Sequence, residues 1–170
     1  APNAAAAYSL RSLTGGDPRV VRVRRDTDGG AGDNDEQDFT ASGISSGALV
    51  AFVGSGNDGF VETWYDQSGN SKDAVQATAG SQPKIVNAGS LVVDSAGLPE
   101  IDFDGSNDCL TASSYSRSGE DLPLTMISVF DQDVAGIDYV VSLNQTNNNA
   151  FDRILLRTDS FDYGRRATDN

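Results

Sequence analysis

Carboxylates are the side chains with which this chain could perform acid–base chemistry. Glycoside hydrolysis needs two of them about 5 to 9.5 Å apart, one as the acid and the other as nucleophile or base. The candidates near strand-like segments are Glu62, Asp66, Glu100, Asp102, Asp104 and Asp108. Because the sequence holds 25 acidic residues, some carboxylates come together by chance, and this set assigns no catalytic residue.

Histidine is absent, and Cys109 is the single cysteine. The chain therefore lacks the commonest general base, the usual zinc ligand and any triad that uses imidazole. One cysteine can form no intrachain disulfide, so packing must stabilise the fold. The position of Cys109 beside Leu110 is compatible with a buried small side chain.

Sugar binding is a second chemistry that the sequence could support. A β-rich run over 61–65 ends in a turn cluster over 66–70. The candidate carbohydrate-binding residues are Trp64, Tyr65, Asp66 and Asn70. Taken singly, each aromatic is more typical of a core residue. Asp66 is likewise more typical of a carboxylate that bonds to its own backbone in an Asx turn.

Metal binding is a third chemistry, because residues 26–38 are rich in hard oxygen ligands suited to calcium. The candidate ligands are Asp26, Asp28, Asp33 and Asp35. Their spacing does not fit an EF-hand loop, since Ala31 stands where the invariant glycine belongs. We favour an exposed acidic loop without a cofactor and keep calcium as the alternative.

Short strands must position these side chains. We expect strands over 20–24, 61–65, 84–86, 91–93, 100–103, 124–130, 139–143 and 151–157, and a further strand after the turn at 160. A single short helix is predicted over 46–52, with Gly54 or Gly56 ending it. This pattern predicts an all-β antiparallel sandwich, formed by one domain over 1–170.

Charge restricts the partners. The net charge is −13, so the chain repels phosphate backbones and anionic lipids, and we expect neither nucleic-acid binding nor membrane insertion. No run approaches the roughly 18 apolar residues of a transmembrane helix. The basic run over 19–25 alternates Val21 and Val23 with Arg22 and Arg24, which predicts a strand with one apolar and one charged face. The acidic cluster that follows is a candidate partner for it.

Several motifs together resemble a known family. The segments are 7–11 (AYSLR), 21–25 (VRVRR), 48–54 (ALVAFVG), 64–69 (WYDQSG), 82–86 (QPKIV) and 103–105 (FDG). This order resembles concanavalin A-like, laminin G-like jelly-roll modules, which recur in bacteriophage virion proteins and bacterial surface proteins. The same N-terminal pattern is similar to the catalytic domain of fungal α-L-arabinofuranosidases of the B type. The resemblance covers about 4–130.

The resemblance implies a jelly-roll sandwich and a non-catalytic structural or adhesion module of a virion protein, such as a tail fibre, baseplate or capsid-surface component. Its partners would be other virion proteins, copies of itself and host-surface glycans. Family members carry further strands, so we expect a longer polypeptide or a neighbouring chain to complete the sheets.

Two alternatives stay open. One is a glycoside hydrolase of the arabinofuranosidase type, although the segment aligned with the nucleophile strand offers Asp152 and Arg153 and no glutamate. The many cysteines of those enzymes are also missing. The other is a secreted bacterial lectin-like adhesin, located outside the cell or at its surface.

Overall fold

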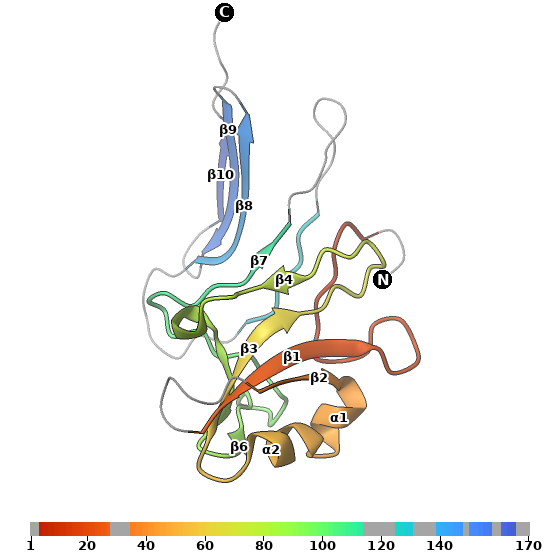
Figure 1. Ribbon diagram of the computed structural model, residues 1–170. Helices are drawn as coiled ribbons and strands as arrows, with labels where there is room; N and C mark the ends of the chain where they lie inside the picture. The colour runs from red at the N-terminus through yellow and green to blue at the C-terminus, as the bar shows by residue number, and fades with distance from the viewer. Residues whose placement is uncertain are drawn as a thin grey trace, which may run out of the picture. The chain divides into compact units, whose positions relative to one another are not determined.

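The computed structural model describes residues 4–27, 35–113, 125–130, 139–147, 150–157 and 161–165. Two compact units divide the chain, Ala1–Arg117 and Ser118–Asn170, and each is described by itself (Figure 1). Two candidate metal ligands, Asp28 and Asp33, lie outside the described residues.

The first unit is built on an antiparallel sheet. Its strands follow the order β2-β1-β3-β4-β7, and β5 pairs with both β3 and β6. Their bounds are β1 (Arg19–Asp26), β2 (Glu36–Thr40), β3 (Asp58–Trp64), β4 (Ala74–Val75), β5 (Lys84–Asn87), β6 (Ser90–Leu91) and β7 (Thr111–Ala112). The strands predicted over 20–24, 61–65 and 84–86 are thereby confirmed. Residues 100–103 form only an isolated bridge, between Asp102 and Lys84.

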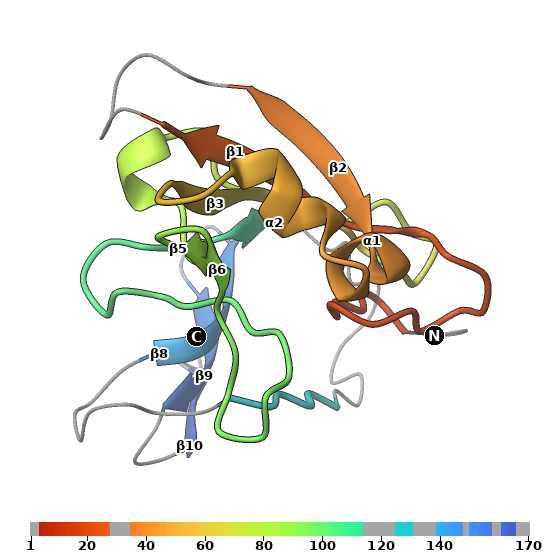
Figure 2. The same cartoon turned by 90° about the horizontal axis from the view of Figure 1, so that it is seen from below.

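Two short α-helices lie along one face of β1, β2 and β3 (Figures 1 and 2). Helix α1 (Ala41–Ser45) begins after Thr40, whose side chain accepts the Gly43 N–H, and it was not predicted. Helix α2 (Ala48–Val53) follows Gly47, which has a φ of 82°, and Gly54 ends it as expected. The predicted start at residue 46 was therefore too early. Gly47, whose backbone is in the left-handed conformation, separates the two helices.

The core lies between these helices and the sheet. Its buried side chains are Val20, Val21, Val23, Phe39, Ile44, Leu49, Val53, Val61, Ile85 and Val86. Packing leaves no room for a side chain at Gly59 in β3, where an added Cβ would lie 2.8 Å from Val53 Cγ2 and 3.1 Å from Val86 Cβ. This glycine allows α2 to approach the sheet.

The basic run forms β1 as predicted, and the acidic residues after it pair with it. Arg22 lies opposite Asp38 in the β1–β2 register. The predicted loop over 26–38 was wrong at both ends, because Asp26 belongs to β1 and residues 36–38 belong to β2. The acidic residues of β2 are stabilised by the neighbouring strand, since Arg22 Nε of β1 donates to Asp38 at 2.8 Å. The local composition of residues 36–38 does not indicate this contact.

A three-stranded antiparallel sheet forms the second unit, in the order β10-β9-β8. Its strands are β8 (Tyr139–Asn147), β9 (Ala150–Arg157) and β10 (Phe161–Arg165), so the strands predicted over 139–143, over 151–157 and after residue 160 are confirmed. The strand expected over 124–130 was wrong at 125–130, which carry no regular structure. A β-branched run forms a strand only where another strand takes its backbone hydrogen bonds.

The described part of the chain is thus an all-β antiparallel fold with two short α-helices. Within that part, no helix has the length and apolar character needed to cross a membrane.

Candidate functional site

The loop after β3 fastens the N-terminal segment to the sheet. Asp66 Oδ1 accepts the backbone N–H groups of Ala7 at 2.9 Å and Ser68 at 2.8 Å. Its Oδ2 accepts the Ser68 hydroxyl at 2.7 Å and the Lys72 N–H at 3.1 Å. Burial raises the pKa of Asp66, but these hydrogen bonds outweigh that effect and lower it below its ordinary value. The Asx-turn interpretation of Asp66 is confirmed.

The Gln67 side chain holds the same segment by three hydrogen bonds. It is 5% exposed, and its Oε1 accepts the Leu13 N–H at 2.8 Å. Its Nε2 donates to the carbonyl oxygens of Ser9 and Arg11, both at 2.9 Å. No local pattern indicates this role, because each partner lies more than 50 positions away in the sequence.

Trp64 and Asn70 also contact the N-terminal segment. The Trp64 ring lies 5.6 Å from the Tyr8 ring, centroid to centroid, and it packs half-buried against the core. Asn70 Nδ2 donates to the carbonyl oxygens of Ala4 at 2.9 Å and Ala5 at 3.2 Å. Both candidate sugar-binding residues therefore have structural contacts.

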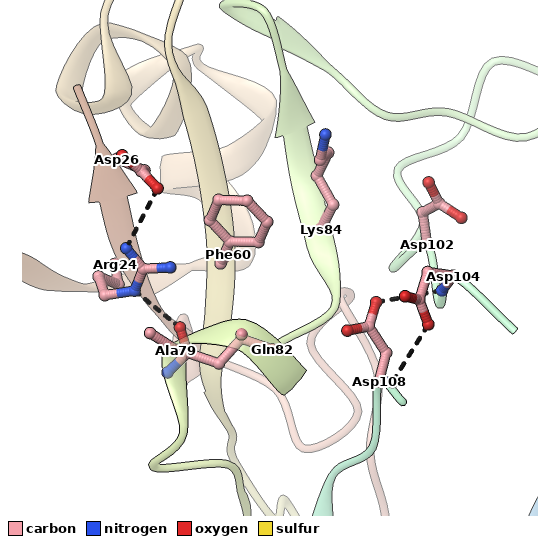
Figure 3. A pocket seen from close by; sticks show the side chains of 10 residues that line it. Arg24, Asp26, Phe60, Ala79, Gln82, Lys84, Asp102, Asp104 and Asp108 are labelled. Atoms are coloured by element: carbon pink, nitrogen blue, oxygen red, sulfur yellow. Dashed lines mark hydrogen bonds and ion pairs between the residues drawn. The ribbon is translucent and has the colours of Figure 1, made fainter. Parts of the chain in front are cut away.

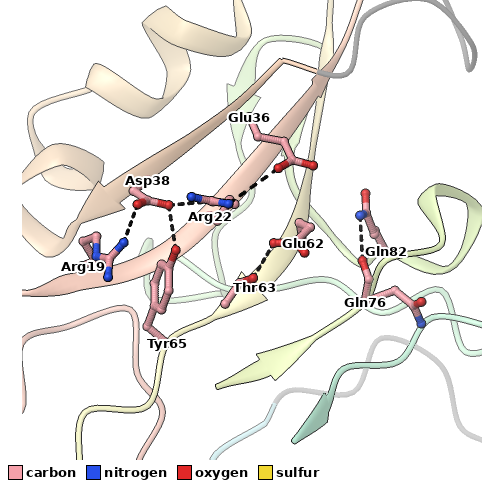
Figure 4. Close-up of polar contacts among 9 residues, drawn as sticks. All are labelled: Arg19, Arg22, Glu36, Asp38, Glu62, Thr63, Tyr65, Gln76 and Gln82. Carbon is pink, nitrogen blue, oxygen red and sulfur yellow. Dashed lines mark hydrogen bonds and ion pairs between the residues drawn. The ribbon is translucent and has the colours of Figure 1, made fainter. Parts of the chain in front are cut away.

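Tyr65 belongs to a charged cluster on β1 and β2 (Figure 4). Its hydroxyl donates to Asp38 Oδ1 at 2.7 Å, and Asp38 also accepts from Arg19 at 2.7 Å and from Arg22 at 2.8 Å. Burial raises the pKa of Asp38, but hydrogen bonds from Arg22, Arg19 and Tyr65 together lower it to about 2. The pKa of Tyr65 rises to about 12, first through burial and then through Asp38.

A small hollow of about 250 Å³ brings two of the four candidate sugar-binding residues together. Tyr65 and Asp66 line it beside Pro18, Arg19 and Asp73, whereas Trp64 and Asn70 are not among its lining residues. Since Asp66 already accepts four hydrogen bonds, its oxygens have little capacity left for a sugar hydroxyl.

Among the candidate metal ligands that are described, Asp26 and Asp35 face cations of the fold. Asp26 lies 3.7 Å from Arg24 Nη1, and Asp35 accepts from Arg25 Nη2 at 2.7 Å. In the described residues, no three acidic or cysteine side chains are grouped as metal ligands would be.

A larger pocket of about 370 Å³ opens beside β1, β3 and β5 (Figure 3). Its walls carry Arg24, Phe60, Gln82 and Lys84, with Asp26, Asp102, Asp104 and Asp108 around them. Three carboxylates considered for hydrolysis, Asp102, Asp104 and Asp108, therefore line one pocket. The sequence indicated neither Phe60 nor Arg24 as part of a site.

The pocket holds two carboxyl groups with opposite pKa displacements. Three backbone N–H groups, of Ser106, Asp108 and Asn107, lower the pKa of Asp104. Burial, followed by the charges of Asp104 and Asp102, raises the pKa of Asp108 and outweighs the hydrogen bond from the Asp104 N–H. Cys109 next to it is exposed, although its position beside Leu110 was compatible with burial.

Comparison of the chain with protein-family models, curated proteins and solved structures gives no match.

Proposed function

We propose that this chain is a non-catalytic structural and adhesion module of a bacteriophage virion protein, with a concanavalin A-like jelly-roll fold. It would be part of a tail fibre, a baseplate or the capsid surface, and would attach to other copies or virion proteins and to host-surface glycans. The resemblance of the sequence motifs to such modules suggests the virion assignment.

One observation carries the structural part of this proposal. The motif that suggests the family, Trp64 to Gly69, fastens the N-terminal segment through Asp66 and Gln67. Residues that hold a fold together can be shared by modules that have no common chemistry, because function depends on sites that vary on the same scaffold.

Mass spectrometry of purified phage particles from the source material tests the assignment. We expect peptides of this chain in many copies per particle, in a polypeptide heavier than the 170 residues. If purified particles lack these peptides and the culture supernatant contains them, the virion assignment is wrong and the secreted adhesin is favoured.

A glycoside hydrolase of the arabinofuranosidase type is the second candidate. The opposite pKa displacements of Asp104 and Asp108 favour it, because such pairs divide the roles of base and acid. Hydrolysis of an aryl arabinofuranoside that disappears in both Asp104→Asn and Asp108→Asn would replace our proposal with the enzyme.

A further inference from the structure

Arg24 presents a hydrogen-bond donor to the pocket beside Phe60. Only 6% of this residue is exposed, and its Nε donates to Gln82 Oε1 at 2.8 Å while Nη1 faces Asp26 at 3.7 Å. Gln82 is fixed in turn, because its Nε2 donates to the Gln76 carbonyl at 2.8 Å. Among the described residues, Arg24 Nη2 has no acceptor, and Figure 3 shows this nitrogen directed to the side of Phe60.

Asp108 presents an acceptor from the opposite wall. Its Oδ2 accepts the Asp104 N–H at 3.1 Å, and no described group donates to its Oδ1. Figure 3 shows the carboxylate facing the middle of the pocket. A partly buried carboxylate oxygen that lacks a donor is stabilised when a ligand supplies one, and the raised pKa of Asp108 agrees with this shortage.

Phe60 lies between two cations that hold its ring in place. The Arg24 guanidinium carbon is 4.9 Å from the ring centroid and Lys84 Nζ is 5.6 Å from it. Lys84 is already bound, because Nζ donates to Asp58 at 2.9 Å and to Asn87 at 3.3 Å. The ring is half-buried, so part of its apolar surface remains open to the pocket.

The charges around this pocket disfavour an anion. Four carboxylates and two cations line it, a formal excess of two negative charges, and both cations already have acidic partners. A ligand must therefore accept from Arg24, donate to Asp108 and offer an apolar face to Phe60 without a negative charge. A saccharide ring with free hydroxyls meets these conditions, and the volume of about 370 Å³ suits a small ligand.

We propose that the pocket formed by Arg24, Phe60, Gln82 and Asp108 binds an uncharged sugar ring. This inference rests on the proposed glycan-binding function and deepens it. It moves the sugar site from the segment containing Trp64, Tyr65, Asp66 and Asn70 to the pocket. In that segment the Tyr65 hydroxyl, the Asp66 carboxylate and the Asn70 Nδ2 already have partners within the fold, whereas among the described residues Arg24 Nη2 and Asp108 Oδ1 have none.

Saturation-transfer NMR with methyl glycosides of glucose, galactose, mannose and N-acetylglucosamine tests the site, and titration gives each Kd. We expect at least one to bind, and methyl glucuronide to bind at least tenfold more weakly than that glycoside. Asp108→Ala and Phe60→Leu should each weaken binding at least fivefold. Asp94→Ala removes the same charge from a turn outside the pocket and should leave Kd unchanged.

Asp108→Ala keeps the test decisive if Phe60→Leu disturbs the sheet, because Asp108 lies in a loop and unfolding is monitored by Tm. Unchanged glycoside binding in a folded Asp108→Ala protein would show that this pocket is not the sugar site. The proposed glycan-binding function would then still hold. Stronger binding of the glucuronide would overturn the preference for an uncharged ligand. If none of the glycosides binds the wild type, both the pocket and the glycan-binding part of the proposed function fall, while the virion assignment keeps its own test.

Discussion

The carboxylate of Asp66 accepts the backbone N–H of Ala7 at 2.9 Å, although 59 positions separate the two residues. Gln67 and Asn70 bind the same N-terminal segment through four further carbonyl contacts. A segment without regular secondary structure therefore gains its backbone partners from one loop, and changes in that loop should release it.

Asp66→Ala should lower the free energy of unfolding by about 2 to 3 kcal/mol, because hydrogen bonds to a charged group are lost and N–H groups lose their acceptor. Urea unfolding measures this change. Hydrogen exchange should also become faster at Ala7. Asp94→Ala is the control, since among the described residues the Asp94 carboxylate accepts only from Ala96 and Leu98 in its own turn. Equal effects of the two changes would contradict the fastening role.

Gln67→Glu should destabilise the fold by about 3 kcal/mol at neutral pH, because a charged oxygen would then face the carbonyl oxygens of Ser9 and Arg11. Burial raises the pKa of the introduced carboxyl in the folded state above its unfolded value near 4.3. The loss of unfolding free energy relative to wild type should therefore be small below about pH 4 and grow as pH rises. A deficit independent of pH would argue against this geometry.

Asp38→Asn should cost about 1 to 2 kcal/mol at pH 7, because a pKa unit corresponds to about 1.4 kcal/mol and partial exposure screens the charges. The folded pKa of about 2 lies below the ordinary value of 3.8. The stability from Asp38 is therefore fully present above pH 4 and disappears as pH falls toward 2. Thermal unfolding of both proteins across this range should show the difference closing.

Gly59→Ala should destabilise by about 1 to 3 kcal/mol, because overpacking forces neighbours to shift. The added Cβ would lie 2.8 Å from Val53 Cγ2 and 3.3 Å from Val23 Cγ1. Gly80→Ala is the matched control, since nothing lies within 4 Å of its added Cβ. Similar Tm values for the two variants would show that α2 can move away from the sheet.

Calcium removal should leave Tm unchanged. Asp26 and Asp35 face Arg24 and Arg25, which a calcium ion would have to displace or accommodate. Thermal unfolding with excess EDTA, compared with excess calcium chloride, measures the effect. A clear fall in Tm with EDTA would establish the acidic segment as a metal site.

The strands that sequence reasoning found are those whose own residues carry the pattern. Val21 and Val23 alternate with arginines, and β1 follows. Strand β2 was missed because Glu36 and Asp38 look like solvated loop residues until Arg24 and Arg22 lie opposite them. Helix α1 was missed because its five residues are too few for a helical period.

The pocket was harder to predict than the strands. The alternation in β1 placed Arg24 on the charged face, whereas Phe60 of β3 and Gln82, which precedes β5, bury it. Phe60 belongs to no sequence motif, and nothing in the sequence distinguished Asp108 from the other acidic residues. The pairing of β3 with both β1 and β5 brings Arg24, Phe60 and Lys84 together, and the segments that contain Gln82 and Asp108 complete the pocket.

The distance in sequence between Ala7 and Asp66 also orders the events of folding. Closing so long a loop costs more conformational entropy than forming a contact between residues close in sequence. The core strands bury more apolar surface than the N-terminal segment does. We therefore expect the N-terminal segment to dock after the β1–β3 sheet has formed. Removal of the Asp66 carboxylate would then speed unfolding and leave the folding rate nearly unchanged.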